Sequence, residues 1–272
     1  MIIYISIRIF ILCIKIKGER DMKVEYFKEY SKCLNRDMEF KVYGHAGQPF
    51  LVFSSQDGRF FDFENFNMLD NVMDLIEGGK IQLFCCDSID NETWSLENED
   101  CHKRIYRHEQ WFNYITNELV MRIFDINKQG NYGHCAEGII TTGCSMGGLH
   151  AANFMFRRPD IFIGTIALSG YYDSDLFFGD YCDELVYNNS PIKYIYGMNY
   201  EHPYLDMYRK NKIILCCGKG AWEDEMLRSI YKMKELLEYK HIPALVDVWG
   251  DDVDHDWSWW RKQFSYFVRK IV

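Results

Sequence analysis

The sequence predicts an α/β fold in which a mainly parallel central sheet is covered by helices on both faces. Short, nearly continuous apolar runs recur along the chain, which is typical of strands buried on both sides. Segments with apolar residues at helical spacing separate these runs, as expected for parallel strands joined by crossover helices. The chain has 272 residues, of which 48% are hydrophobic, so it can bury the core of one large α/β domain.

The predicted strands follow one another from residue 38 onward. The clearest are the apolar runs PFLVFS at 49–54 and KIQLFCC at 80–86. Their near-continuous apolar character, without alternation, indicates burial on both faces. The full set of predicted strands covers residues 38–43, 49–54, 80–86, 138–142, 162–169, 212–217 and 244–249.

The predicted helices occupy the segments between the strands. Helix 68–78 ends at a Gly-Gly pair, a common helix stop. Helix 108–127 repeats apolar residues at helical spacing, among them Trp111, Ile115 and Leu119. The full set of predicted helices covers residues 68–78, 108–127, 146–158, 224–240 and 256–270.

The stretch 171–208 interrupts this alternation. It is rich in Tyr, Phe, Asp and Asn and shows no clean periodicity. An irregular aromatic segment of this length is commonly a lid or pocket wall when it lies beside an active site. A packed surface excursion is an equally good interpretation, and the sequence leaves both open.

The first 21 residues differ from the rest of the chain. Residues 1–17 read MIIYISIRIFILCIKIK, which is too short and too charged for a membrane span of about 20 apolar residues. The segment also lacks the small-residue cleavage site of a signal peptide. We therefore expect residues 1–21 to be an extension outside a single domain formed by 22–272. A membrane-associating anchor is the less favoured alternative.

Charge and cysteine usage exclude several classes of function. A formal net charge of −9 without any Lys/Arg-rich block argues against nucleic-acid binding. The ten cysteines form no C-x-x-C pair and no zinc-like spacing, so we predict neither a metal nor a cofactor. The adjacent pairs Cys85-Cys86 and Cys216-Cys217 lie in strand-like runs, where one thiol of each pair should face each side of the sheet. These features predict reduced, mostly buried thiols in a cytoplasmic protein.

The most informative motif is Gly143-Cys144-Ser145-Met146-Gly147. This G-x-S-x-G sequence lies between a predicted strand and a predicted helix, the context of a nucleophile elbow. A serine at such a tight turn stands clear of the sheet, and the glycines leave room where a side chain would collide with backbone. The N-terminal amides of the following helix can stabilise developing negative charge beside it. The motif therefore predicts that Ser145 is a catalytic nucleophile.

A serine nucleophile needs a base, and the base needs an orienting acid. In this structural context the order along the chain is Ser, then Asp or Glu, then His. His255 lies in the loop between the last predicted strand and the last predicted helix, which makes it the candidate base. Glu223, after strand 212–217, is the favoured acid. Asp224 is the alternative acid, although it could simply cap the next helix.

An oxyanion hole requires two backbone amides. The amide of Met146, directly after the nucleophile, should supply one of them. The other should come from the loop 54–58 (SSQDG) after strand 49–54, where the amides of Ser55 and Gln56 are the candidates.

Three segments together resemble the putative esterase family, a branch of the α/β hydrolases with esterase D-like, feruloyl esterase-like and mycolyltransferase-like members. They are GCSMGG at 143–148, ALSGYYD at 167–173, and HDW at 255–257 with WR at 260–261. The similarity extends over about residues 23–272 and implies the α/β-hydrolase fold.

The resemblance also carries the family's nucleophile and base onto Ser145 and His255. A glutamate acid in mycolyltransferase-like members supports Glu223, although many relatives have an aspartate where Ala221 stands here. The loop 54–58 replaces the His-Gly-Gly sequence of many esterases.

These observations predict a serine hydrolase that cleaves small-molecule acyl esters through an acyl-Ser145 intermediate. An acyltransferase of the same fold is one alternative, because a second alcohol can replace water at the acyl-enzyme. A non-catalytic binding protein with this fold is the other, since fold alone does not establish function.

Overall fold

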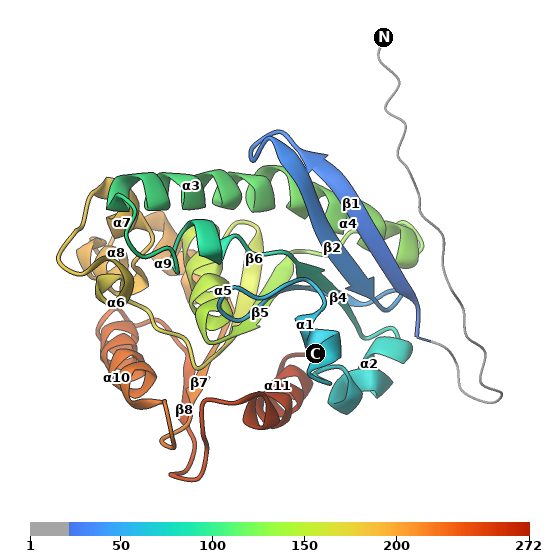
Figure 1. Cartoon of the computed structure of the whole chain (residues 1–272). Coiled ribbons are helices and arrows are strands. Elements are labelled where there is room, and N and C mark those ends of the chain that lie inside the picture. The colour runs from blue at the N-terminus through green and yellow to red at the C-terminus, as the bar shows by residue number, and fades with distance from the viewer. Residues whose placement is uncertain (1–21) are drawn as a thin grey trace.

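The computed structural model describes residues 22–272, so the prediction for residues 1–21 lies outside the described part of the chain. An eight-stranded sheet runs through the centre, with the strand order β1-β2-β4-β3-β5-β6-β7-β8 (Figure 1). Strands β3 to β8 are parallel to one another, whereas β1 and β2 are antiparallel at one edge. The strands are β1 (Val24–Ser31), β2 (Arg36–Tyr43), β3 (Gln48–Phe53), β4 (Ile81–Cys86), β5 (Ile139–Cys144), β6 (Phe162–Leu168), β7 (Lys212–Cys217) and β8 (Leu245–Val248).

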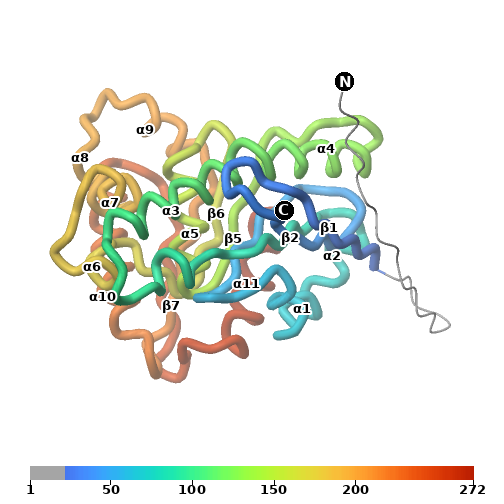
Figure 2. The backbone as a smooth tube through the Cα atoms, turned by 45° about the horizontal axis from the view of Figure 1, so that its top comes forward, coloured from blue at the N-terminus to red at the C-terminus, as the bar shows by residue number. Residues whose placement is uncertain are grey.

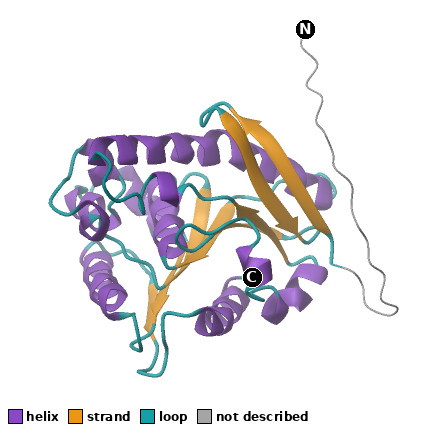
Figure 3. Cartoon of the chain, viewed as in Figure 1, coloured by secondary structure: helices purple, strands orange, loops and turns teal. Residues whose placement is uncertain are grey.

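Helices cover both faces of the sheet, as Figure 3 shows by secondary structure. One face packs against α3 (Cys101–Tyr114), α4 (Val120–Gly130), α5 (Met146–Arg157) and α10 (Asp224–Tyr239). The other face packs against α1 (Asp62–Asn65), α2 (Met73–Glu77) and α11 (Trp257–Ile271). The predicted fold class is therefore confirmed.

The two adjacent cysteine pairs illustrate how the strands divide their side chains. Cys86 and Cys217 lie in the core on one face of the sheet, and Cys85 and Cys216 lie in the core on the other. The prediction that each pair is split across the sheet is confirmed, because successive side chains of a strand point to opposite faces. The nine cysteines within residues 22–272 are all free thiols.

Two elements differ from the sequence-based expectation. Strand β1 was not predicted. It is an edge strand whose side chains alternate between partial burial and exposure, so it lacks the apolar run that marks the central strands. The helix predicted over 108–127 begins earlier, at Cys101, where the Asp100 carboxylate accepts a hydrogen bond from the Lys103 amide. It continues through a π-helical turn, η3 (Ile115–Leu119), into α4.

The irregular stretch after β6 folds into four short helices. They are α6 (Asp175–Phe178), α7 (Glu184–Asn188), α8 (Pro191–Gly197) and α9 (Pro203–Tyr208). In the backbone trace these helices form the side of the molecule beside α3, α5 and α10 (Figure 2).

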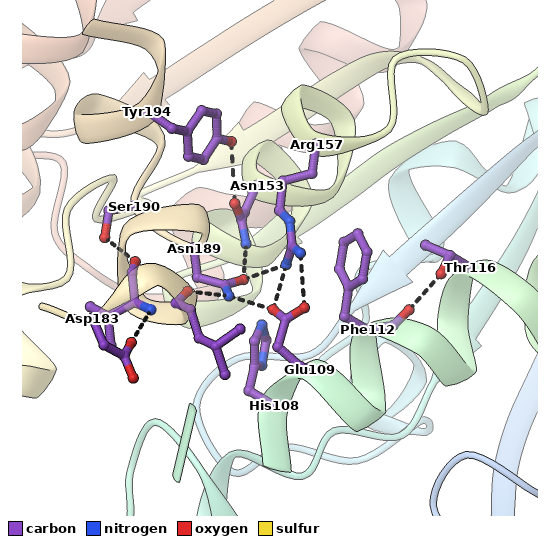
Figure 4. A network of polar contacts seen from close by, with 12 residues as sticks. His108, Glu109, Phe112, Thr116, Asn153, Arg157, Asp183, Asn189, Ser190 and Tyr194 are labelled. Carbon is purple, nitrogen blue, oxygen red and sulfur yellow. Dashed lines mark hydrogen bonds and ion pairs between the residues drawn. The ribbon is translucent and has the colours of Figure 1, made fainter. Parts of the chain in front are cut away.

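A partly buried polar network joins this excursion to α3 and α5 (Figure 4). The Arg157 guanidinium donates two hydrogen bonds to the Glu109 carboxylate, at 2.8 and 2.9 Å. It also donates to Asn189 at 2.8 Å, and the Asn189 amide donates to Glu109. Asn153 joins Asn189 to the Tyr194 hydroxyl. A bidentate Arg–carboxylate pair with satisfied neighbours is a rigid connection, so this part of the excursion is a packed structure rather than a hinged lid.

Within residues 22–272, no helix is both long enough and apolar enough to cross a membrane. The segments that follow β5, β7 and β8 meet at the carboxyl edge of the sheet, where open α/β sheets place their sites.

Candidate active site

Ser145 occupies a strained turn between β5 and α5. Its backbone has φ 59° and ψ −123°, a conformation that residues other than glycine seldom adopt. The Ser145 amide donates a 2.9 Å hydrogen bond to the Leu168 carbonyl of the neighbouring strand, which holds the turn against the sheet. Strain of this kind persists where the surroundings enforce it, and it is common at functional sites.

The glycines around Ser145 are required by close backbone packing. A β-carbon at Gly143 would collide with the backbone of Gly147 and Phe53. A β-carbon at Gly147 would collide with the carbonyl oxygens of Phe53 and Ser54. The first turn of α5 can therefore lie directly against the end of β3, which brings the loop after β3 next to Ser145.

His255 reaches Ser145 from the loop after β8. Its Nε2 lies 2.8 Å from the Ser145 Oγ, within hydrogen-bonding distance. The His255 ring also meets the indole of Trp260 edge to face, with ring centroids 4.8 Å apart. Both Ser145 and His255 remain partly accessible, so a ligand can approach the pair from solvent.

Glu223 lies behind His255 and is almost fully buried, with 1% of its surface exposed. Its Oε2 lies 3.5 Å from the His255 Nδ1. That separation is longer than a normal hydrogen bond, and neither atom has another hydrogen-bond partner within residues 22–272. Since catalytic hydrogen bonds are often long until a substrate is bound, the two atoms are placed to close on one another.

Asp224, the alternative acid, is not brought to His255. It is exposed at the first position of α10, and within residues 22–272 it forms no ion pair with a histidine. The sequence favours Glu223 but leaves Asp224 open, because both stand at the start of the same helix. The structure separates them, because Glu223 is buried 3.5 Å from His255 whereas Asp224 is exposed.

Two residues that sequence reasoning did not select hold Glu223 in place. The Ser169 hydroxyl donates a 2.5 Å hydrogen bond to the Glu223 Oε1. The same Ser169 oxygen accepts a 2.9 Å hydrogen bond from the indole N–H of Trp260. All three side chains are buried, and Ser169 itself has a positive φ of 49°. The only sequence signal for them was their presence in segments that carry the family resemblance.

The loops that carry Glu223 and His255 are joined along their backbones. The Gly220 amide donates to the Val253 carbonyl at 2.9 Å, and the His255 amide donates to the Ala221 carbonyl at 2.9 Å. The Asp254 carboxylate accepts the Ala221 amide at 2.7 Å. A β-carbon at Gly220 would collide with Asp254, so glycine is needed for this contact. The acid and the base are thereby placed on one connected unit.

The predicted oxyanion residues lie beside the elbow. Met146 is the first residue of α5, so its amide has no partner from within the helix and lies directly after Ser145. Ser55 is half-buried and Gln56 is exposed in the loop after β3. The backbone of Phe53 and Ser54, at the start of this loop, abuts Gly147.

Two other reactive side chains near the elbow are unsuited to the chemistry. Burial raises the pKa of the Cys144 thiol well above its ordinary value, so the thiol stays protonated and inert. His150, on α5, is fully buried and pairs with Asp90 at 2.8 Å instead of facing Ser145.

The family model described as putative esterase matches residues 31–271. The chain belongs to this family. No curated protein matches its sequence. The family predicted from the sequence motifs is thus confirmed, and the protein is a carboxylic ester hydrolase of the serine type.

Solved structures share the fold of this esterase at low sequence identity. A ferulic acid esterase matches with a TM-score of 0.71 and 16% identity, covering 93% of this chain and 100% of that one. An S-formylglutathione hydrolase from Agrobacterium tumefaciens matches with a TM-score of 0.68 and 14% identity, covering 92% and 94%. A ferulic acid esterase from Anaeromyces mucronatus matches with a TM-score of 0.65 and 12% identity, covering 94% and 92%. These likenesses show the α/β-hydrolase fold.

Proposed function

We propose that this esterase hydrolyses small-molecule acyl esters with Ser145 as nucleophile, His255 as general base and acid, and Glu223 as the orienting acid. The observation that carries the proposal is the 2.8 Å contact between the His255 Nε2 and the Oγ of a serine held in a strained turn. A serine hydroxyl is a weak nucleophile until a base within this distance can take its proton.

The first half of the reaction forms the acyl-enzyme. The Ser145 Oγ attacks the ester carbonyl carbon while its proton passes to the His255 Nε2. The carbonyl oxygen becomes an oxyanion, which the Met146 amide and an amide of Ser55 or Gln56 would stabilise. The C–O bond to the alcohol then breaks, and the imidazolium of His255 returns its proton to the departing alcohol oxygen.

The second half releases the acid. A water molecule gives a proton to the His255 Nε2 and attacks the acyl carbon. The bond to the Ser145 Oγ then breaks, and this oxygen takes the proton back from His255. The buried Glu223 carboxylate stabilises the imidazolium in both halves and fixes the ring tautomer in which Nε2 is free to accept a proton.

The free thiols of the described residues support a location in the cytoplasm, where such thiols stay reduced. The acidic net charge supports a small-molecule substrate rather than nucleic acid.

Reaction with a fluorophosphonate probe tests the proposed nucleophile. We expect stoichiometric labelling of Ser145, because the probe's phosphorus is attacked by an activated serine as an ester carbonyl would be. Peptide mass spectrometry after labelling locates the modified residue. Labelling at another serine, or none at all under conditions that label a known serine esterase, would contradict the assignment.

Ser169 provides a second test, because it acts on Glu223 and does not face the substrate. Ser169→Ala removes the hydroxyl that donates to the Glu223 Oε1. We expect kcat for a short acyl ester to fall by up to about 100-fold, with KM unchanged, because the carboxylate that orients His255 loses its anchor. Steady-state kinetics measures both constants.

Ser190→Ala is the matched control for that variant. It removes another buried serine hydroxyl, which donates a 2.7 Å hydrogen bond to the Val186 carbonyl rather than to a residue of the site. Each variant loses a buried hydrogen bond, at a cost to stability of about 1 kcal/mol. Only Ser169→Ala should show the large loss in kcat. Equal losses in both variants would indicate a purely structural role for Ser169.

A further inference from the structure

Trp222, directly before Glu223, is unusually placed for a tryptophan. Its side chain is largely in solvent, with 83% of the residue exposed. Its backbone has a φ of +66°, a conformation that is strained for any residue with a bulky side chain. Exposing a large apolar ring and straining its backbone both cost free energy, and packing within the fold does not explain either.

The residues on both sides of Trp222 are held in place, Ala221 by the histidine loop and Glu223 by Ser169. The Ala221 amide donates to the Asp254 carboxylate at 2.7 Å, and the Ala221 carbonyl accepts from the His255 amide at 2.9 Å. On the other side, the Glu223 carboxylate is held by Ser169. The backbone that carries the Trp222 indole is therefore held in a fixed position beside His255.

The reaction chemistry determines which part of an ester lies on that side. The His255 Nε2 gives its proton to the departing alcohol oxygen, so the alcohol part must lie next to His255. The carbonyl oxygen points instead toward the Met146 amide at the start of α5. Trp222 belongs to the loop of Glu223, whose backbone is hydrogen-bonded to the His255 loop. It therefore lies on the His255 side of the site, where the alcohol part leaves, and not on the side of the Met146 amide.

We propose that Trp222 is a binding subsite for the alcohol part of the substrate and that it selects alcohols with an uncharged ring, which stacks on the indole. This inference rests on the proposed function. An indole offers a flat face to an aryl ring or to the apolar face of a sugar. Anionic alcohols are disfavoured by the exposed carboxylates close by in sequence, which include Asp224, Asp251 and Asp252.

Acetate esters that differ only in their alcohol test the subsite. Ethyl acetate lacks a ring, benzyl acetate carries an aryl ring, and methyl 6-O-acetylglucopyranoside carries a sugar ring. All three form the same acetyl-enzyme, so differences in kcat/KM report the step in which the alcohol is still attached. In Trp222→Ala we expect kcat/KM to fall about tenfold for one or both ring esters and to stay unchanged for ethyl acetate. Comparing the losses in kcat/KM for benzyl acetate and for the sugar acetate shows which ring the subsite prefers.

Three further variants make the result specific. Trp222→Phe should keep most of the ring preference because it keeps a flat ring. Trp222→Gly removes the ring at a position whose positive φ suits glycine, so it should match Trp222→Ala without any loss of folding. Tyr132→Ala is the matched control: Tyr132 is also aromatic, 97% exposed and at a positive φ of 54°, but it lies in the turn between α4 and β5, away from the His255 loop.

Several outcomes would overturn the subsite. One is an equal loss for ethyl acetate, since that would mean Trp222 only supports Glu223. Another is an unchanged kcat/KM for both ring esters in Trp222→Ala. If the wild-type enzyme hydrolyses no acetate ester and Ser145 also resists fluorophosphonate, the proposed function fails together with the subsite. If the enzyme hydrolyses ethyl acetate and Trp222→Ala changes kcat/KM for neither ring ester, the subsite alone is overturned.

Discussion

Replacing Ser145 with alanine is expected to lower kcat for ester hydrolysis by about 10⁶-fold. The variant loses the Oγ atom that lies 2.8 Å from the His255 Nε2, and with it the acyl-enzyme route. Hydrolysis that remains would come from the amides of the oxyanion hole and from substrate positioning. Alanine is no bulkier than serine at this positive φ, so the turn and the fold should persist. Ester hydrolysis assays together with a thermal unfolding curve measure both effects.

Ser190→Ala serves as the control for this variant. Ser190 is fully buried, and its hydroxyl donates a 2.7 Å hydrogen bond to the Val186 carbonyl, away from the elbow. Its loss should reduce stability by about 1 kcal/mol and leave kcat unchanged. If Ser145→Ala kept more than a small fraction of wild-type turnover, Ser145 could not be the nucleophile.

The elbow and the base could be predicted from the sequence because their signals are local. In the motif Gly143-Cys144-Ser145-Met146-Gly147, both glycines are needed because the backbone packs closely around the turn. A strand pattern comes directly before the motif and a helix pattern directly after it. His255 was found in a similar way, because it follows the last strand and precedes the last helix. In both cases a chain segment and its immediate neighbours contain the whole signal.

The support of the acid could not be predicted, because it depends on contacts between distant parts of the chain. Ser169 is 54 residues from Glu223, and Trp260 is 91 residues from Ser169, yet one chain of hydrogen bonds joins all three. Nothing in the local pattern of a strand end such as Ser169 indicates which carboxylate its hydroxyl will meet.

The missed fold elements have a different cause. Strand β1 and the helices of the 171–208 excursion are stabilised by their neighbours more than by their own periodicity. The excursion depends on contacts such as those of Arg157 with Glu109 and Asn189, which come from three separate helical or loop segments. Helices of four to seven residues are also too short for the helical spacing of apolar residues to be recognised in the sequence.

The second large effect is expected from Glu223→Gln, which should lower kcat by about 10⁴-fold. Glutamine keeps the shape of the side chain and can still accept the hydrogen bond from Ser169. Its amide group, however, would donate to the His255 Nδ1, where the carboxylate accepts. The histidine would then carry its proton on Nε2, where it cannot take the proton of Ser145, and the imidazolium would lose its nearby negative charge. Steady-state kinetics with a short acyl ester measures the loss.

Asp224→Asn is the matched variant, since it makes the same chemical change one residue later. Asp224 is exposed, and its negative charge at the start of α10 contributes only the modest stabilisation of an acid near a helix N-terminus, about 0.3–1 kcal/mol. Its kcat should therefore stay close to the wild-type value. A large loss in Asp224→Asn with little change in Glu223→Gln would reverse the assignment of the acid. The two carboxylates are neighbours in sequence, but only Glu223 is enclosed with His255, Ser169 and Trp260. Comparing the two variants therefore tests whether this enclosure identifies the acid.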